Sequence, residues 1–203
     1  GNVAEHDGGG MYDDGSFVGG TSSPVLTNVY FVGNAARYGG GMHNDGSNRG
    51  ESSPRLTNVL FSGNQASGHG GGMFNDGSHD GESSPTLTNV TFSGNWASHD
   101  GGGMFNEVSD LALGTCNMQL TNVVMWGNAA GSYGEQLYHD YGTLVLSYTL
   151  IQSGTNQILG DVTYGDGVVT VDPQFVNPIT ATAAPTTAGD YRLTAASPAV
   201  DAG

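Results

Sequence analysis

The stretch Ser83–Ser109, SSPTLTNVTFSGNWASHDGGGMFNEVS, decides the fold because most of it recurs in register elsewhere in the chain. A Gly-Gly-Gly-Met tetrapeptide occurs four times, with successive copies 31 positions apart. A Phe-x-Gly-Asn motif precedes each of the last three copies at a nearly constant spacing. A fixed period of this size is the signature of a solenoid or a repeat array.

Within one unit, the apolar residues predict short strands and not a helix. Val90 and Phe92 show the period of two that is expected of a strand with one buried face. Leu87 breaks the alternation, so we expect a tight turn near Thr88–Asn89, where Asn tolerates the left-handed conformation. The Gly-rich segments supply further corners. Each unit is therefore expected to be one coil of an all-β solenoid.

Stacking of the coils is required for stability. About five buried side chains give a coil roughly 10 kcal/mol, whereas ordering about 31 residues costs several times more. Stacked coils turn each position into a column of like residues. We expect a core formed by Met11, Met42, Met73, Met104, Phe31, Phe61 and Phe92. We expect two ladders of Asn amides, one formed by Asn34, Asn64, Asn95 and Asn128 and the other by Asn28, Asn58, Asn89 and Asn122.

The repeat predicts one domain over 1–203, with about six coils of roughly 26–33 residues. Regular 31-residue repeats cover 1–110, degenerate coils cover 111–170, and 171–203 is expected to be a closing coil. The corner that contains Leu111, Leu113 and Cys116 is expected to be packed and not solvated.

The paired motifs resemble those of a known family. Phe-x-x-Asn (Phe31–Asn34 and its copies) alternating with Gly-Gly-Gly-Met resembles the motifs of chlamydial polymorphic outer-membrane proteins and related bacterial surface proteins. In that family the second motif is Gly-Gly-Ala followed by an aliphatic residue. The segments 172–177 and 190–203 look like the closing coils of large secreted proteins of this type. The resemblance implies a right-handed parallel β-helix at the cell surface or outside the cell, and it implies no particular activity.

Composition limits the partners. Four Arg, no Lys and 19 acidic residues give a formal charge of −15, which disfavours nucleic acid and other polyanions. Cations, neutral glycans and other proteins remain as possible binding partners. The single Cys116 excludes an internal disulfide. No run of apolar residues is long enough for a membrane-spanning helix, so we expect no membrane insertion.

Acidic turns, histidines and hydroxyl groups are the candidate site residues. Ca²⁺ takes six to eight oxygen ligands, and the proposed ligands are Asp45, Asp76, Asp80 and Asp100, although turn geometry alone also explains these residues. His6, His69 and His99 are expected to form an exposed ridge with two Tyr, and His43, His79 and His139 to lie on the surface. Candidate glycosylation sites are Asn89, in an Asn-Val-Thr triplet, and Thr182, Thr186 and Thr187.

Two other functions also remain possible, namely catalysis on a polysaccharide and binding to ice. A polysaccharide lyase or hydrolase would need paired carboxylates, or Ca²⁺ with a base such as Arg55, and its best location is 111–139. An ice-binding face would use the column of Thr27, Thr57, Thr88 and Thr121, with Asn as its second column.

The favoured function is that of a non-catalytic extracellular structural protein. Gly1-Asn2 falls where Gly33-Asn34 falls, so the first coil is incomplete, and we expect the last strand (191–200) of one subunit to meet it in the next. Such a head-to-tail contact does not close and produces a filament. An adhesin that binds a glycan or a protein receptor is the alternative, and a catalytic β-helix is the second alternative.

Overall fold

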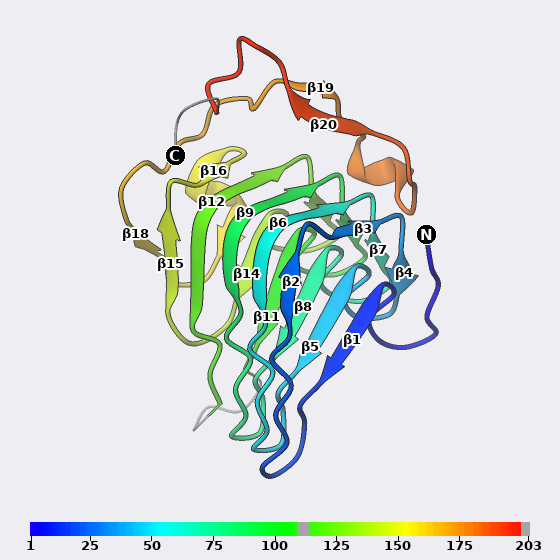
Figure 1. Ribbon diagram of the computed structural model, residues 1–203, viewed down its shortest axis with the longest axis vertical. Helices are drawn as coiled ribbons and strands as arrows, with labels where there is room; N and C mark the ends of the chain where they lie inside the picture. The colour runs from blue at the N-terminus through cyan, green and yellow to red at the C-terminus, as the bar shows by residue number, and fades with distance from the viewer. Residues whose placement is uncertain (109–113, 200–203) are drawn as a thin grey trace.

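The chain forms an all-β parallel solenoid, in which three sheets run along the stack and enclose one apolar core (Figure 1). The computed structural model describes residues 1–108 and 114–199. Every strand pair within the three stacked sheets is parallel. The predicted fold class is therefore confirmed.

The six-stranded sheet contains β1 (Met11–Asp14), β5 (Met42–Asp45), β8 (Met73–Asp76), β11 (Met104–Glu107), β14 (Leu137–His139) and β17 (Ile158–Leu159). The four-stranded sheet contains β4 (Ala35–Ala36), β7 (Gln65–Ala66), β10 (Trp96–Ala97) and β13 (Ala129–Ala130). The eight-stranded sheet contains β2 (Val25–Thr27), β3 (Tyr30–Val32), β6 (Arg55–Ser62), β9 (Thr86–Ser93), β12 (Met118–Trp126), β15 (Leu144–Ser147), β16 (Leu150–Ile151) and β18 (Thr163–Tyr164).

The coil count differs slightly from the prediction. The stack makes about four turns, whereas about six coils were expected. The two larger sheets receive strands from six successive layers, but the four-stranded sheet receives strands from only four. The layers at the two ends are therefore partial coils, which a count of motifs along the sequence cannot distinguish from complete ones.

The core consists of columns of identical side chains. The ring centroids of Phe31 and Phe61 are 4.8 Å apart and those of Phe61 and Phe92 are 4.7 Å apart, with the rings nearly parallel. Met42, Met73 and Met104 are completely buried in register, and Met11 packs partly buried at one end. These contacts repeat at the strand spacing of about 4.8 Å.

The Gly-Gly-Gly corners have two separate causes. The first Gly of each triplet has a positive φ, for example 68° at Gly70, which favours Gly over other residues. The second Gly is required by close stacking, because a Cβ at Gly71 would lie 2.4 Å from the carbonyl oxygen of Gly102. The corner therefore accepts no side chain where one coil lies on the next.

A buried amide ladder joins the coils beside the Phe column. The Asn34 Nδ2 donates to Asn64 Oδ1 (3.0 Å), Asn64 to Asn95 (2.9 Å) and Asn95 to Asn128 (2.8 Å). Each Oδ1 also accepts the backbone N–H of the Asn in the preceding coil. These amides are at most 5% exposed, so they satisfy backbone groups that water cannot reach.

The second predicted ladder lies on the surface and runs the other way. Asn58 donates to Asn28 (3.2 Å), Asn89 to Asn58 (3.0 Å) and Asn122 to Asn89 (2.7 Å). All four residues have φ between 55° and 58°, as expected for Asn in the left-handed region. Strands β6, β9 and β12 continue through this position, so the expected turn is a bend within one strand.

A third ladder was not predicted. The Asn44 Nδ2 donates to Asn75 Oδ1 (2.6 Å) and Asn75 to Asn106 (2.7 Å), and the Asn106 Nδ2 lies 3.2 Å from Nδ1 of His139. His139 is 1% exposed, so the prediction of a surface position for His139 is wrong. His139 occupies the register position of Asn106 in the next coil, and its ring nitrogen takes over as the partner of the amide.

The described part of the expected closing coil, residues 171–199, does not add a coil to the stack. Its strands β19 (Phe175–Asn177) and β20 (Asp190–Leu193) pair antiparallel with each other, apart from the stacked sheets. The short 3₁₀ helix η2 (Ala181–Ala183) lies between them, and a second one, η1 (Gly154–Gln157), precedes β17. We call the described residues 172–199 the C-terminal arm.

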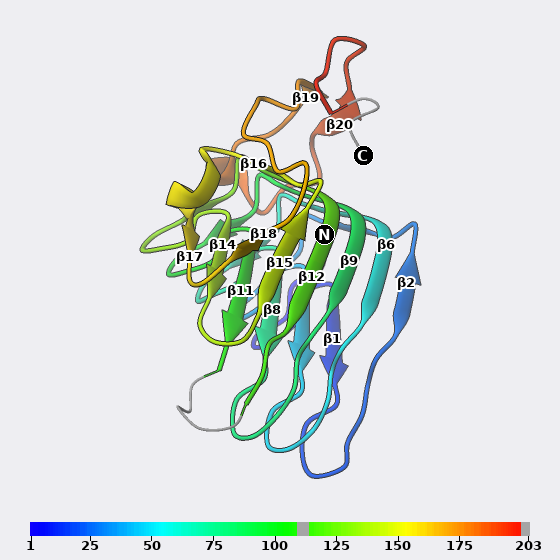
Figure 2. The same ribbon diagram turned by 90° about the vertical axis from the view of Figure 1, so that its left-hand side faces the viewer.

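The C-terminal arm runs back along the side of the stack (Figures 1 and 2). Ile179 packs against the corner glycines Gly63 and Gly94, and the Thr186 N–H donates to the Gly63 carbonyl (3.0 Å). The last strand, expected over 191–200, is only Asp190–Leu193 and is already paired with β19. It therefore does not lie at the end of the stack, where the expected contact with a second subunit would require it.

We predict that Asn64→Ala lowers the free energy of unfolding by about 3–5 kcal/mol, because it leaves several buried donors and acceptors without partners. The Asn64 amide donates to the Phe31 carbonyl and to Asn95 and accepts two hydrogen bonds from Asn34. Asn58→Gly is the matched control, since it keeps the positive φ and removes only exposed bonds, and it should cost about 1 kcal/mol or less. Denaturant unfolding followed by circular dichroism measures both, and equal losses would contradict the role of the buried ladder.

Candidate functional site

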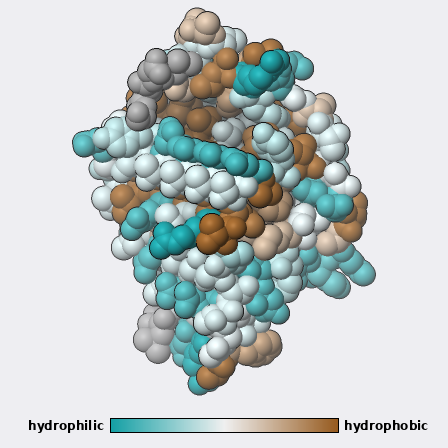
Figure 3. Space-filling view, in the orientation of Figure 1, coloured by the Kyte–Doolittle hydropathy of each residue, from teal (hydrophilic) through white to brown (hydrophobic). Residues whose placement is uncertain are grey.

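The outer face of the eight-stranded sheet presents two parallel columns of polar side chains. Thr27, Thr57, Thr88 and Thr121 are in register, and Ser147 continues the column. The exposed Asn ladder, Asn28 to Asn122, lies one residue further along each strand. Figure 3 shows the two columns as a hydrophilic row and a pale row that cross the front of the molecule. We call these two columns the Thr/Asn array.

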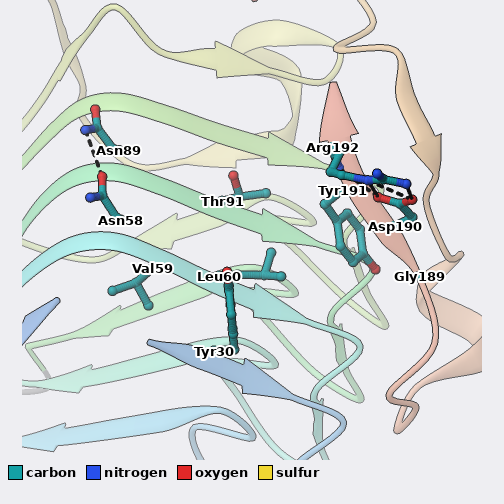
Figure 4. Close-up of a pocket in the computed structure, with 10 residues that line it drawn as sticks. All are labelled: Tyr30, Asn58, Val59, Leu60, Asn89, Thr91, Gly189, Asp190, Tyr191 and Arg192. Carbon is teal, nitrogen blue, oxygen red and sulfur yellow. Dashed lines mark hydrogen bonds and ion pairs between the residues drawn. The ribbon is translucent and has the colours of Figure 1, made fainter. Parts of the chain in front are cut away.

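A groove lies between this sheet and the C-terminal arm. It has a volume of about 390 Å³. Its lining residues are Tyr30, Asn58, Val59, Leu60, Asn89, Thr91, Gly189, Asp190, Tyr191 and Arg192. Figure 4 shows that the sheet supplies the first six and the arm supplies the other four. We call this the arm groove.

The arm groove combines an aromatic surface with hydrogen-bonding groups. Tyr30 is 75% exposed, which leaves its ring available to a ligand. The Asn58 and Asn89 amides are held by their ladder bond (3.0 Å). The guanidinium of Arg192 donates from Nε to both carboxylate oxygens of Asp190, at 2.9 and 3.1 Å. This hydrogen bonding lowers the pKa of Asp190, so its carboxylate is ionised at neutral pH.

A second hollow lies further along the same sheet, with a volume of about 350 Å³. Val124, Tyr148 and Leu150 line it from the coils, and Pro198 and Ala199 line it from the arm. Its lining is more apolar than that of the arm groove. Both hollows therefore have one wall from the sheet or its coils and one wall from the arm.

The aromatic and histidine residues form a double stack on the six-stranded sheet. The ring column contains Tyr12, His43, Phe74, Phe105 and Tyr138. His43 is 5% exposed and lies 4.7 Å from the Phe74 ring, so its predicted surface position is wrong. His79 is exposed, as expected.

The expected histidine ridge covers this ring column. His69 stacks on Tyr38 at 6.0 Å and on His99 at 5.2 Å, and its ring also meets Phe105 at 4.7 Å. Burial lowers the pKa of His69, and this outweighs the opposite effect of the nearby Asp100 carboxylate. His69 is thus partly covered, whereas the ridge was expected to be exposed.

The four proposed Ca²⁺ ligands do not converge. Asp45 and Asp76 are neighbours in register, but each carboxylate accepts the backbone N–H two residues later. Asp100 lies 3.1 Å from His69 and accepts the Tyr133 N–H (3.0 Å). Asp80 sits in a turn with a positive φ of 62°. Among the described residues, no group of three or more His, Cys, Asp or Glu is arranged to hold a metal ion.

The candidate glycosylation residues have different surroundings. Asn89 is exposed, but its amide takes part in two ladder bonds. Thr182 and Thr187 are exposed on the C-terminal arm, and Thr186 is half-buried against Gly63. Thr182 and Thr187 are therefore the more accessible hydroxyl groups.

The residues weighed for catalysis have different surroundings. Arg55 is exposed at the start of β6, beside the Thr column. Of the region 111–139, residues 111–113 lie outside the described part of the chain, so the packing of Leu111 and Leu113 is not described. Cys116 is completely buried, and burial raises the pKa of its thiol well above the usual range.

Glu107 stands in a column of carboxylates with Asp14, Asp45 and Asp76. Burial, followed by the charges of Asp76 and Asp140, raises the pKa of Glu107 to about 7 from 4.5. The folded chain therefore binds this proton more tightly than the unfolded chain does. The stabilisation is fully present below about pH 4.5 and is lost as the pH rises to about 7.

We predict that Glu107→Gln stabilises the fold by about 1–2 kcal/mol at pH 8, after allowance for partial solvent screening, and much less at pH 4. Thermal unfolding measured across this pH range tests the effect, with Glu5→Gln at an exposed position as the control. An identical pH dependence in wild type and Glu107→Gln would show that Glu107 does not titrate in this window.

The described part of the chain contains no helix that is long and apolar enough to cross a membrane. Comparisons with protein-family models, with curated proteins and with solved structures found no match. The parallel β-solenoid is therefore established by the structure, while the resemblance to chlamydial polymorphic outer-membrane proteins rests on the quoted motifs alone.

Proposed function

We propose that this protein is a non-catalytic adhesive module that acts at the cell surface or outside the cell and binds an uncharged glycan in the arm groove. The single observation that supports this function is the groove itself, which is lined by an exposed Tyr ring and fixed amides from the sheet and by residues of the C-terminal arm. The extracellular setting is supported by the motif resemblance to bacterial surface proteins. Adhesion is thus favoured over the filament function that the sequence suggested first.

The lining of the arm groove suits a sugar. An aromatic face offers the apolar contact area that a sugar ring can cover, and Tyr30 offers such a face at the rim. The Asn58 and Asn89 amides each retain one N–H and one oxygen lone pair after their two ladder bonds. Hydroxyl groups of a glycan can bond to these free positions. The second hollow, on the same sheet, suits a ligand longer than one or two sugars.

The negative charge of the protein favours an uncharged ligand. The chain carries a formal charge of −15, which repels anionic polysaccharides at a distance. The one cation of the arm groove, Arg192, is already paired with Asp190. A neutral glycan is not repelled by the net charge, and it can bind without separating Arg192 from Asp190.

The same lining argues against hydrolysis. Glycosidases of the usual type need two carboxyl groups, one of them protonated. Asp190 is the one carboxyl group among the ten residues that line the arm groove, and its pKa is lowered and not raised. The remaining polar groups, amides and hydroxyls, hold a ligand without transferring protons.

Head-to-tail association is the second candidate. The two large sheets have β1 and β2 at one edge and β17 and β18 at the other. Among the described strands, each of these four has one edge without a neighbour, and such edges are templates for pairing with another chain. Contact between copies would use these strands, since the last strand β20 belongs to the arm.

We predict that Tyr30→Ala lowers the affinity for neutral glycans at least 10-fold, which corresponds to about 1.4 kcal/mol. Tyr30 is mostly exposed, so its removal should leave the fold intact. A glycan microarray followed by calorimetry on the best ligand provides the measurement. Tyr133→Ala is the matched control, because Tyr133 is 64% exposed outside the groove. Failure of the wild-type protein to bind any neutral glycan would overturn the proposed function.

We predict that, if the second candidate holds, negative-stain electron microscopy of the concentrated protein shows uniform unbranched fibres. Addition of EDTA should leave them intact, because no metal-binding group was found among the described residues. Short particles of one size at every concentration would contradict head-to-tail association and would have no bearing on the adhesive function.

A further inference from the structure

We infer that the Thr/Asn array is a second binding surface, which shares Asn58 and Asn89 with the arm groove, and that it binds the ordered surface of a crystalline uncharged polysaccharide. The array consists of hydroxyl groups in one column and amides in the next, both repeated once per strand. The proposed partner is a solid whose hydroxyl groups also repeat in rows.

The amides of the array are held in fixed orientations. Asn58 and Asn89 each donate one N–H to the Asn of the preceding coil and accept one from the Asn of the following coil. Each therefore presents one remaining N–H and one remaining lone pair in a direction set by the ladder. Groups that are already ordered lose little entropy on binding, so a ligand that binds these amides does not have to order their side chains.

The Thr column supplies free hydroxyl groups. The hydroxyl groups of Thr27, Thr57, Thr88 and Thr121 form no side-chain hydrogen bond with any other described residue. Thr27 and Thr121 are exposed, and Thr57 and Thr88 are partly so. The β-branched side chains also have few rotamers. The column thus adds a second row of donors and acceptors at the same spacing of about 4.8 Å.

The charge of the surface selects the partner. The two columns contain no charged residue, although the molecule carries a formal charge of −15. An uncharged array within so acidic a molecule fits an uncharged partner, and the surrounding charge repels anionic polymers. A cationic surface would instead be drawn to the acidic turns.

The size of the array explains why the partner is a solid. Four strands at about 4.8 Å cover only about 15 Å, and each exposed hydrogen bond contributes about 1 kcal/mol or less. Measurable binding therefore requires many of these bonds to form together, with the partner already ordered. A single dissolved chain would have to lose its own flexibility, so it should bind far more weakly than the same polymer in a crystal.

The test is a pull-down with microcrystalline cellulose, with amorphous cellulose and soluble cello-oligosaccharides as comparisons. We expect retention on the crystalline solid and at least 10-fold weaker binding to the other two. The double variant Thr57→Val/Thr88→Val, which keeps the shape and β-branching of both residues, should lose at least 10-fold. The control Thr180→Val/Thr182→Val changes two exposed hydroxyl groups on the C-terminal arm and should bind like the wild type.

Thr88→Lys provides a second variant, since its long charged side chain blocks the column. Unfolding curves verify that each variant is folded. The inference is overturned by any of three results: no retention of the wild type, equal retention of the Thr57→Val/Thr88→Val variant, or equal binding to amorphous and crystalline cellulose. Thermal hysteresis of ice without retention on cellulose would likewise overturn it and assign the array to ice. Tyr30→Ala, which acts in the arm groove, should retain cellulose binding, so the outcome is distinct from that of the proposed function.

Discussion

The structure depends on the hydrogen bond that one buried Asn donates to the next along the stack. Each amide of the Asn34 to Asn128 column satisfies both its neighbour's side chain and a backbone N–H of the adjacent coil. A shift of one residue in one direction would place a Gly, which has no side chain, where the amide is needed and would leave buried donors unpaired. The ladder therefore fixes the register between coils, and the packing of the Phe and Met columns follows from that register.

The same register sets the character of the outer surface. Because every coil is aligned with the next, an outward Thr or Asn in one coil lies directly on its counterpart. The regular Thr/Asn array is thus a consequence of the buried ladder, and no separate interaction is needed to align it. Regularity on the outside alone would not indicate a function. The inference depends on the free hydrogen-bonding groups and on the absence of charge in these two columns.

The sequence was informative wherever the repeat is regular. Identical residues at a 31-residue spacing predicted the columns of Phe61 and Met73, because an identical residue in each coil has an identical environment. The third ladder was missed because two of its members, Asn44 and Asn75, begin Asn-Asp-Gly segments that resemble turns. The C-terminal arm was missed for a different reason. Its contacts, such as Ile179 on Gly63, join a unique segment to repeated glycines, and a period contains no information about such a pairing.

The two proposed binding surfaces therefore differ in origin and in the ligands they suit. The Thr/Asn array is produced by repetition, so it can match only a partner that repeats. The arm groove is produced where the non-repetitive arm approaches the sheet, and it is lined both by sheet residues such as Tyr30 and Asn89 and by arm residues that occur once, such as Tyr191. A site of this kind distinguishes one ligand from another, because its two walls come from unrelated segments. Because Asn58 and Asn89 belong to both surfaces, the repeated amide row offers the same groups to an ordered solid along the array and to a single glycan in the arm groove.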